Sequence, residues 1–251
     1  MIELERVVKK FGDLVAVDEL SLSVGRGEFF AVLGPNAAGK TTTIKILAGL
    51  IQPTSGHARI AGFDVQAHPV EVRRRMAYVP DFPFLYDKLT PWEFIRFTGQ
   101  MFRMPDPEIE SRGVVLTRRF NLEPYLRKPI EGLSHGTRQR VAIVSALLHD
   151  PDVFVIDEPM VGLDPHHARV VKDVLKERSR QGMTVFLSTH QLSVAEEMAD
   201  RIGIIHRGRL VAVGTREELR QQTGVTGPLE ETFLSLTAQE ANVKEDQSRP
   251  G

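Results

Sequence analysis

The 251-residue chain contains no cysteine and no long apolar run. Without cysteine, disulfide bridges, thiolate catalysis and cysteine-ligated metal sites are excluded. Crossing a bilayer takes about 20 mostly apolar residues, and the best candidates here, such as 141–148, are short and interrupted by polar side chains. If the protein works at a membrane, we therefore expect another chain to supply the membrane-spanning part.

An excess of one charge is also missing, since 32 lysines and arginines face 33 aspartates and glutamates and the net charge is −1. A balanced chain has no strong overall field that attracts nucleic acid or acidic lipid, so we expect no nucleic-acid partner. Residues 1–5 lack the basic and apolar regions of a signal peptide, which predicts a cytoplasmic protein. No internal repeat is visible, which argues against two fused copies of one domain.

What the chain does have is a segment, 34–41, with the sequence Gly-Pro-Asn-Ala-Ala-Gly-Lys-Thr, which fits the phosphate-loop pattern Gly-x-x-x-x-Gly-Lys-Thr. The apolar residues 29–33 before it predict a buried strand, and residues 42–50 after it predict a helix. A loop between a strand and a helix directs backbone N–H groups at one point, where the helix N-terminus adds partial positive charge. This context disfavours the alternative of a glycine-containing turn with an exposed lysine.

Each part of this loop has an expected task in holding a nucleotide. The glycines let the backbone pass close to phosphate oxygens, because no Cβ is in the way. Lys40 is expected to reach the β- and γ-phosphates and to act in catalysis, while Thr41 offers its hydroxyl to Mg²⁺. The expected nucleotide contacts are Gly34, Pro35, Asn36, Ala37, Ala38, Gly39, Lys40, Thr41 and Thr42.

The periodicity of the remaining chain predicts an α/β fold. Leu20, Leu22 and Val24 alternate with serines, as in a strand with one exposed face. Continuous apolar runs at 153–156 and 184–187 predict strands that are covered on both faces. We therefore expect an N-terminal antiparallel β subdomain that leads into the parallel sheet of a phosphate-loop (P-loop) NTPase core.

Helical signals separate these strands. Thr90 and Glu93 form a capping box with Pro91 at the first helical position, and Ser193 with Glu196 predicts a second capping box. The predicted single domain, 1–237, consists of a core of 1–81 and 149–220, a helical insertion of 82–148 and a C-terminal helical ending of 221–237, followed by a polar tail of 238–251 that is predicted to be disordered.

An acidic pair, Asp157 and Glu158, directly follows the apolar strand 153–156. Ligands in open α/β folds bind beyond the carboxyl ends of the strands, so we expect the pair to stand opposite the phosphate loop. Asp157 would hold Mg²⁺, directly or through water, and Glu158 would polarise the attacking water as a general base. Alone, the pair is explained equally well as a strand end and a helix cap, and only the upstream phosphate loop favours the functional interpretation.

His190 lies just past the strand 184–187 and is expected at the same edge of the sheet. There it would donate a hydrogen bond to the γ-phosphate and help to position the water. A lone histidine is more often a solvated residue, but its place after a core strand supports the catalytic interpretation. No second histidine or cysteine with ligand spacing lies near it in the sequence, which disfavours zinc.

With these residues in place, the chain resembles the ATP-binding cassette (ABC) ATPases over about 2–236. The segment 133–140, Leu-Ser-His-Gly-Thr-Arg-Gln-Arg, is similar to the family's signature segment. The segment 157–165 is similar to the Walker B carboxylates followed by the D-loop, and 188–190 to the switch-histidine segment. Phe11 matches the aromatic residue that stacks on adenine. Together with the phosphate loop, the order of these segments makes the resemblance specific.

The resemblance implies a mechanism, cofactors and partners. ATP and Mg²⁺ would be bound between two cassettes, identical or different, that dimerise head to tail. Ser134 and Gly136 would face the γ-phosphate of ATP on the other subunit, which is reasonable because Ser134 is expected to begin a helix. Hydrolysis would loosen the dimer and change the conformation of an integral membrane permease. The protein would thus be peripheral on the inner face of the cell membrane.

The chain also departs from the family pattern. Ala37 stands where glycine is common, which suits alanine if the backbone there stays in an ordinary conformation. His135 and Thr137 stand where the signature usually has glycine and glutamine. Asp81 stands at the Q-loop position, where a glutamine usually bridges Mg²⁺, water and the helical subdomain. Asp81 is carried over as an Mg²⁺ and coupling-loop residue, although a carboxylate cannot donate a hydrogen bond as an amide can.

Two functions of different kinds follow. Segment 228–237 resembles the ending common in export-type bacterial cassettes, which predicts an ATPase subunit that drives a separate exporter permease. The alternative is an ATP-dependent switch outside transport with slow turnover, motivated by Asp81 and His135. A kinase or nucleotide transferase would explain neither the signature segment nor His190. Trp92 and nearby phenylalanines either form a groove for the permease or belong to the core of the helical insertion, and the core is favoured.

Overall fold

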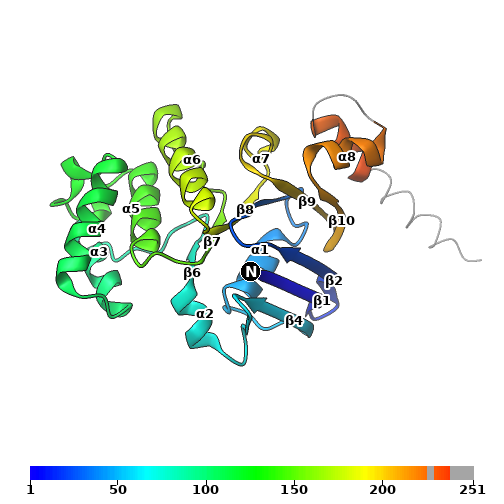
Figure 1. Ribbon diagram of the computed structural model, residues 1–251, viewed down its shortest axis with the longest axis horizontal. Coiled ribbons are helices and arrows are strands. Elements are labelled where there is room, and N and C mark those ends of the chain that lie inside the picture. The colour runs from blue at the N-terminus through cyan, green and yellow to red at the C-terminus, as the bar shows by residue number, and fades with distance from the viewer. Residues whose placement is uncertain (225–228, 238–251) are drawn as a thin grey trace, which may run out of the picture.

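The computed structural model describes residues 1–224 and 229–237, so the predicted tail 238–251 lies outside the described residues. Two sheets lie side by side, with a group of helices at one end (Figure 1). The strands are β1 (Ile2–Phe11), β2 (Leu14–Val24), β3 (Phe29–Leu33), β4 (Ser55–Ile60), β5 (Phe63–Asp64), β6 (Met76–Val79), β7 (Val153–Asp157), β8 (Thr184–Thr189), β9 (Arg201–His206) and β10 (Arg209–Gly214). The helices are α1 (Lys40–Leu47), α2 (Pro69–Arg75), α3 (Pro91–Met101), α4 (Asp106–Arg119), α5 (His135–Leu147), α6 (Pro165–Arg180), α7 (Leu192–Met198) and α8 (Arg216–Thr223).

The smaller sheet is antiparallel, with the strand order β2-β1-β4-β5. In β2 the apolar residues Leu20, Leu22 and Val24 are buried while the serines between them are exposed. This alternation has the period of two that a strand with one solvated face requires. The predicted N-terminal antiparallel subdomain is therefore confirmed.

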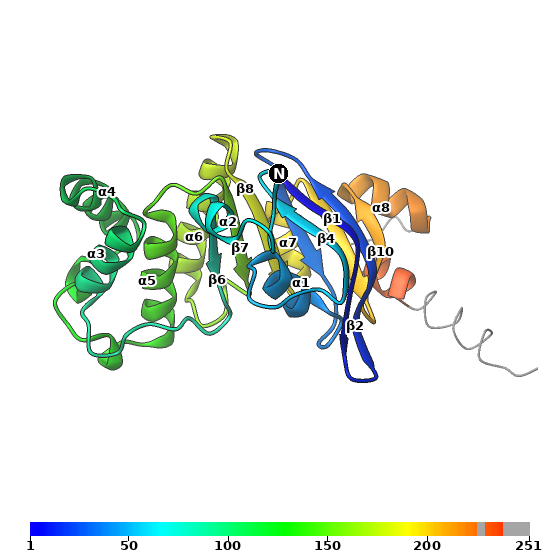
Figure 2. The ribbon, with the colours of Figure 1, turned by 90° about the horizontal axis from the view of Figure 1, so that it is seen from below.

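The larger sheet has the order β10-β9-β3-β8-β7-β6, and only its β9–β10 hairpin is antiparallel. Every residue of β3 is buried. Phe29, Ala31 and Leu33 face one hydrophobic core, while Phe30 and Val32 face the other. Helix α1 lies between the two sheets, and Figure 2 shows it on the inner side of the curved antiparallel sheet. The phosphate-loop strand is thus held in the middle of the molecule, as the parallel core predicted.

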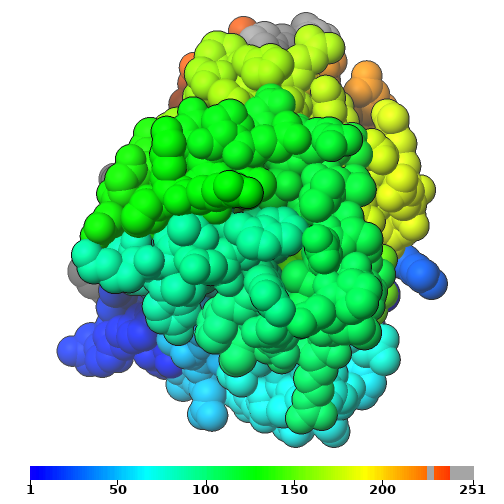
Figure 3. All heavy atoms as spheres, turned by 90° about the vertical axis from the view of Figure 1, so that its left-hand side faces the viewer, coloured from blue at the N-terminus to red at the C-terminus, as the bar shows by residue number. Residues whose placement is uncertain are grey.

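Helices α3, α4 and α5 form the end of the molecule that faces the viewer in Figure 3. The capping box at the start of α3 is present, because Thr90 Oγ1 accepts from the Glu93 amide at 3.3 Å and Glu93 Oε2 accepts from the Thr90 amide at 2.8 Å. A Cβ added at Gly113 of α4 would lie 3.0 Å from the Trp92 ring, so the partly buried Trp92 packs against α4 within the helical insertion. Across residues 1–224 and 229–237, no helix has both the length and the apolarity that crossing a membrane requires.

The second predicted capping box is wrong. Helix α7 begins at Leu192, and its N-cap residue, Gln191, makes no side-chain capping bond. The carboxylate of Glu196 is engaged elsewhere, since its Oε1 accepts from the Leu229 amide at 3.1 Å and pairs with Arg216 Nε at 3.3 Å. The Glu196 side chain therefore makes tertiary contacts with Leu229 and Arg216, although the local sequence predicted that it would cap α7.

Candidate nucleotide-binding site

A cavity of about 690 Å³ lies at the carboxyl ends of β3, β7 and β8. It collects residues from segments far apart in the chain: the β1–β2 turn, the phosphate loop, the segment after β6, and the segments after β7 and β8. The predicted site residues that line it are Phe11, Asn36, Ala37, Ala38, Gly39, Lys40, Thr41, Thr42, Asp81, Asp157, Glu158 and His190. Gly34 and Pro35 lie at the base of the loop, where their carbonyl oxygens accept from Lys40.

Two glycines of the loop have no room for a side chain. A Cβ at Gly34 would lie 2.3 Å from the carbonyl oxygen of Ile205 in β9. Gly39 has φ +106, and a Cβ there would lie 2.5 Å from the carbonyl oxygen of Ala16 in β2. The loop is therefore pressed between two strands, and only glycine permits that approach.

Lys40 begins helix α1 and is almost fully buried. Its Nζ donates to the carbonyl oxygens of Gly34 at 2.5 Å and Pro35 at 3.0 Å. Burial lowers the pKa of Lys40, while the negative charges of Glu158 and Asp157 act in the opposite direction. The ammonium has three donors, so it can exchange loop carbonyls for phosphate oxygens without leaving its place.

Three oxygen-bearing side chains meet beside Lys40. Thr41 Oγ1 donates to Asp157 Oδ2 at 3.1 Å, which joins α1 to the end of β7. Asp81, which follows β6, lines the same cavity, and its Oδ1 is buried without a hydrogen-bond partner in the described part of the chain. Burial and then the charge of Asp157 raise the pKa of Asp81. An unpartnered carboxylate oxygen beside a hydroxyl and a second carboxylate suits a hard divalent cation such as Mg²⁺.

Glu158 and His190 are in direct contact. His190 Nδ1 lies 2.7 Å from Glu158 Oε1, and Thr189 Oγ1 donates to Glu158 Oε2 at 3.1 Å. The Glu158 amide donates to the carbonyl oxygen of Ser188 at 2.9 Å, so the ends of β7 and β8 are tied together. The Glu158 side chain is only 13% exposed. A carboxylate held next to an imidazole at the mouth of this cavity has the geometry of a proton acceptor with an orienting partner.

Phe11 forms the apolar end of the cavity, together with Leu14 and Val15. Its ring is 49% exposed, with Lys9 Nζ 4.9 Å from the ring centroid. An exposed aromatic ring at the rim of a cavity that otherwise carries charge offers a flat surface for a base.

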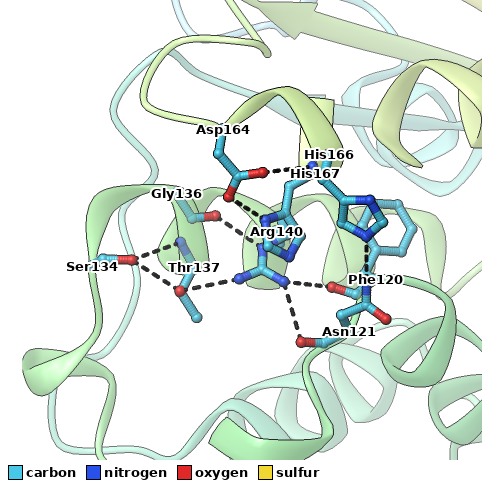
Figure 4. Close-up of polar contacts among 9 residues, drawn as sticks. All are labelled: Phe120, Asn121, Ser134, Gly136, Thr137, Arg140, Asp164, His166 and His167. Carbon is cyan, nitrogen blue, oxygen red and sulfur yellow. Dashed lines mark hydrogen bonds and ion pairs between the residues drawn. The ribbon is translucent and has the colours of Figure 1, made fainter. Parts of the chain in front are cut away.

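The signature segment lies outside the cavity, because Ser134 and Gly136 are not among its lining residues. Ser134 caps helix α5, accepting from the Thr137 amide at 3.3 Å, as expected. Figure 4 shows the buried Arg140 behind it, which donates to the carbonyl oxygens of Phe120 and Asn121 at 2.7 and 3.2 Å. The single chain thus holds the two halves of the predicted ATP site apart.

The structure corrects one expectation and adds residues that the sequence did not reveal. Ala37 has φ +62, in the left-handed region and not in an ordinary conformation. The cavity is also lined by Leu14, Val15 and Ala16 of β2 and by Arg207 of the β9–β10 turn. The apolar runs 202–205 and 210–213 on either side of Arg207 and Gly208 favour a hairpin, but no local signal shows which cavity a hairpin tip reaches.

A phosphate loop between a buried parallel strand and a helix, faced by two carboxylates at the end of a neighbouring strand, defines a P-loop NTPase. A family profile described as ABC transporter matches residues 17–161. The chain therefore belongs to the ABC transporter family, and it is an ABC ATPase.

Individual proteins support this assignment. The linearmycin resistance ATP-binding protein LnrL of Bacillus subtilis (strain 168) is 32% identical over 242 residues, which cover 96% of this chain and 76% of that protein. A solved structure of the ATP-binding subunit of an ABC transporter has a TM-score of 0.90 at 35% identity and covers 94% of this chain and 99% of its own. A dimeric ATP-binding cassette in a post-hydrolysis state with ADP and Pi has a TM-score of 0.79 at 27% identity and covers 86% and 98% of the two chains.

Proposed function

We propose that this chain is the ATP-hydrolysing subunit of an exporter, in which dimerisation of two cassettes on ATP drives a separate membrane permease. The observation that carries the proposal is the convergence of Lys40, Thr41, Asp157 and Glu158 on one cavity. Asp157 and Thr41 are 116 residues apart in sequence, yet their side chains are hydrogen-bonded. The name of the relative LnrL, a resistance ATP-binding protein, fits the removal of a toxic compound from the cell.

The nucleotide would be held along the cavity from Phe11 to Lys40. The adenine would stack on the exposed Phe11 ring, and the β- and γ-phosphates would meet the Lys40 ammonium and the backbone N–H groups of the loop. Thr41, Asp157 and Asp81 would hold Mg²⁺, which neutralises phosphate charge when bound. The unpartnered Asp81 Oδ1 supports this role for a carboxylate where the family usually has glutamine.

Glu158 would accept the proton of the attacking water. Its two carboxylate oxygens are engaged by His190 and Thr189, which fixes the carboxylate at the mouth of the cavity. His190 is more than half exposed at its side chain, so it can turn toward a γ-phosphate while Glu158 keeps its place. A positioned base of this kind contributes about 10²–10⁴ in rate.

The second half of each ATP site would come from another cassette. Ser134 and Gly136 lie outside their own chain's cavity, and the N-terminus of helix α5 behind them is a favourable site for phosphate. The solved cassette of similar fold with ADP and Pi is dimeric, which supports this arrangement. ATP would then join two subunits, and its hydrolysis would release them.

A separate apolar groove of about 350 Å³ would receive the permease. It lies between the end of α1, the segment after β6, and helices α3 and α5, and it is lined by Leu50, Phe84, Phe94 and Phe102. Leu50 and Phe84 both line the groove and are 58% and 93% exposed, and apolar side chains exposed together mark an interaction site. The groove is lined by Pro80 and Pro83, which lie on either side of Asp81 in sequence, so a segment bound there would contact the same loop that would reach Mg²⁺.

Two variants test the ATP site. Lys40→Ala should abolish tight Mg-ATP binding, because it removes the buried ammonium, whereas Lys45→Ala, on the exposed side of the same helix α1, should leave the dissociation constant unchanged. Glu158→Gln should keep ATP affinity, slow hydrolysis by about 10²–10⁴ and accumulate a dimer on size-exclusion chromatography with ATP. Unchanged affinity in Lys40→Ala would refute the phosphate-loop assignment, and wild-type turnover in Glu158→Gln would show that another group is the base.

The alternative is an ATP-dependent switch outside transport. Purification of the tagged protein from its own membranes separates the two functions. Recovery with a protein of many membrane spans supports the exporter subunit, while recovery with soluble partners alone supports the switch.

A further inference from the structure

The nucleotide cavity contains an arginine, Arg207, to which the proposed function assigns no role. Arg207 lies in the turn between β9 and β10, next to β2, and lines the cavity. Its side chain is exposed and makes no hydrogen bond or ion pair with any described residue. Of the lysines and arginines in residues 1–224 and 229–237, only Lys40 and Arg207 line this cavity.

Hydrogen bonds hold the turn that carries Arg207 to two neighbouring segments, the phosphate loop and β2. The Gly208 amide donates to the carbonyl oxygen of Ala38 in the phosphate loop at 2.8 Å. The Gly208 carbonyl oxygen accepts from the Asp18 amide of β2, also at 2.8 Å, and Arg209 Nε donates to the Asp18 carboxylate at 2.7 Å. The position of Arg207 relative to the loop is therefore built into the backbone.

The contacts of Gly208 show which end of a nucleotide the turn approaches. A Cβ at Gly39 would lie 3.3 Å from the Gly208 Cα, and a Cβ at Gly208 would lie 3.0 Å from the Ala16 carbonyl oxygen. Ala16 borders the apolar part of the cavity with Phe11 and Val15, where the base is proposed to stack. The turn that carries Arg207 thus stands between Ala16, in the apolar part of the cavity, and the phosphate loop.

The negative charge of the cavity favours binding of a nucleotide by an additional cation such as the Arg207 guanidinium. Asp81, Asp157 and Glu158 all line it, against a single buried ammonium. A nucleoside diphosphate or triphosphate adds several negative charges of its own. Arginine offers a planar fork of donors that matches two phosphate oxygens at once. Arg207 would not have to break a hydrogen bond or ion pair with any described residue in order to bind them.

We propose that Arg207 is a nucleotide-binding residue, whose guanidinium contacts the phosphate chain next to the sugar. The inference rests on the proposed ATP site and adds a residue to it. Because the phosphate next to the sugar is common to ADP and ATP, Arg207 should strengthen the binding of both to the same degree. It should therefore set nucleotide affinity without distinguishing the two.

The test compares Arg207→Gly with Arg103→Gly in the full chain. Both arginines are exposed and have positive φ, +47 and +59, so glycine suits either backbone, and Arg103 does not line the cavity. Titration calorimetry with ADP and with a non-hydrolysable ATP analogue should show dissociation constants about fivefold higher for Arg207→Gly at low salt, as for an exposed ion pair. Arg103→Gly should match the wild type, and Arg207→Lys should lie between.

Salt provides the second readout. Screening weakens a contact between exposed charges, so the ratio between Arg207→Gly and wild type should shrink toward one at high salt. A ratio below two at low salt, or a ratio that salt does not change, would overturn the phosphate contact. A wild-type protein that binds neither nucleotide would instead remove the proposed function, and this inference with it.

Discussion

Replacing Gly162 by alanine tests a contact that ties the signature segment to the loop after β7. Gly162 has φ +75, and a Cβ there would lie 2.3 Å from Cδ2 of His135. The Phe82 ring packs against the imidazole, with ring centroids 5.9 Å apart. Its Nε2 is also buried. His135 therefore fills the space that any side chain at position 162 would need.

The expected loss of stability in Gly162→Ala has two parts. A left-handed backbone costs alanine about 1–2 kcal/mol, and forcing a methyl group into filled space costs about 1–3 kcal/mol more. For a chain of this size about 1 kcal/mol lowers the melting temperature by about 2–4 °C. With about 3.5 kcal/mol as the middle of the summed range, Gly162→Ala should lower it by roughly 7–14 °C in the wild-type background. With His135→Ala already present, only the backbone part remains, and the decrease should be roughly 3–6 °C.

The assay is thermal unfolding of the two single variants, the double variant and the wild type. Gly62→Ala is a matched control, since Gly62 has φ +82 with nothing within 4 Å of its added Cβ, so it reports the backbone cost alone. An equal decrease for Gly162→Ala with and without His135 would refute the steric part of the reasoning. A decrease no larger than that of Gly62→Ala would refute it as well.

Three further predictions concern strain, pH and a buried cation. Ala37→Gly should raise the melting temperature, because it relieves a left-handed alanine at about 1 kcal/mol; an unchanged or lower value contradicts this. Burial lowers the pKa of His149 to about 4 from 6.5, so the unfolded state binds the proton more readily and stability should fall by up to about 3 kcal/mol as pH decreases through this window. Urea unfolding across that range should show a flatter profile for His149→Phe, which keeps the stacking on Phe102; an unchanged profile contradicts it. Arg140→Lys should lower the free energy of unfolding by about 2 kcal/mol, since lysine lacks the planar fork in which one nitrogen donates to the carbonyl oxygens of Phe120 and Asn121 and another donates to the Thr137 hydroxyl. Urea unfolding measures this change, and a loss below about 0.5 kcal/mol contradicts it.

Much of the fold and of the candidate site follows from local sequence. The phosphate loop is a contiguous motif, so the roles of Lys40 and Thr41 were predicted from the sequence of residues 34–41 and from the strand and helix on either side of it. The carboxyl ends of parallel strands meet at one edge of a sheet, which placed Asp157, Glu158 and His190 beside that loop before any coordinates. Alternation in β2 and the continuous apolar run of β7 predicted one sheet with a solvated face and one covered on both faces.

What required the tertiary structure is every feature that depends on packing between distant segments. Ala37 adopts a left-handed backbone, which its residue type disfavours, in a loop that is pressed against β9 and β2 at Gly34 and Gly39. Glu196 binds the Leu229 amide and does not cap its own helix α7, because the fold brings Leu229 within hydrogen-bond distance of its carboxylate. Arg207 lines the nucleotide cavity because its hairpin is hydrogen-bonded to the phosphate loop. Periodicity and motifs report forces along one segment, whereas these positions are set by how neighbouring segments exclude and bond one another.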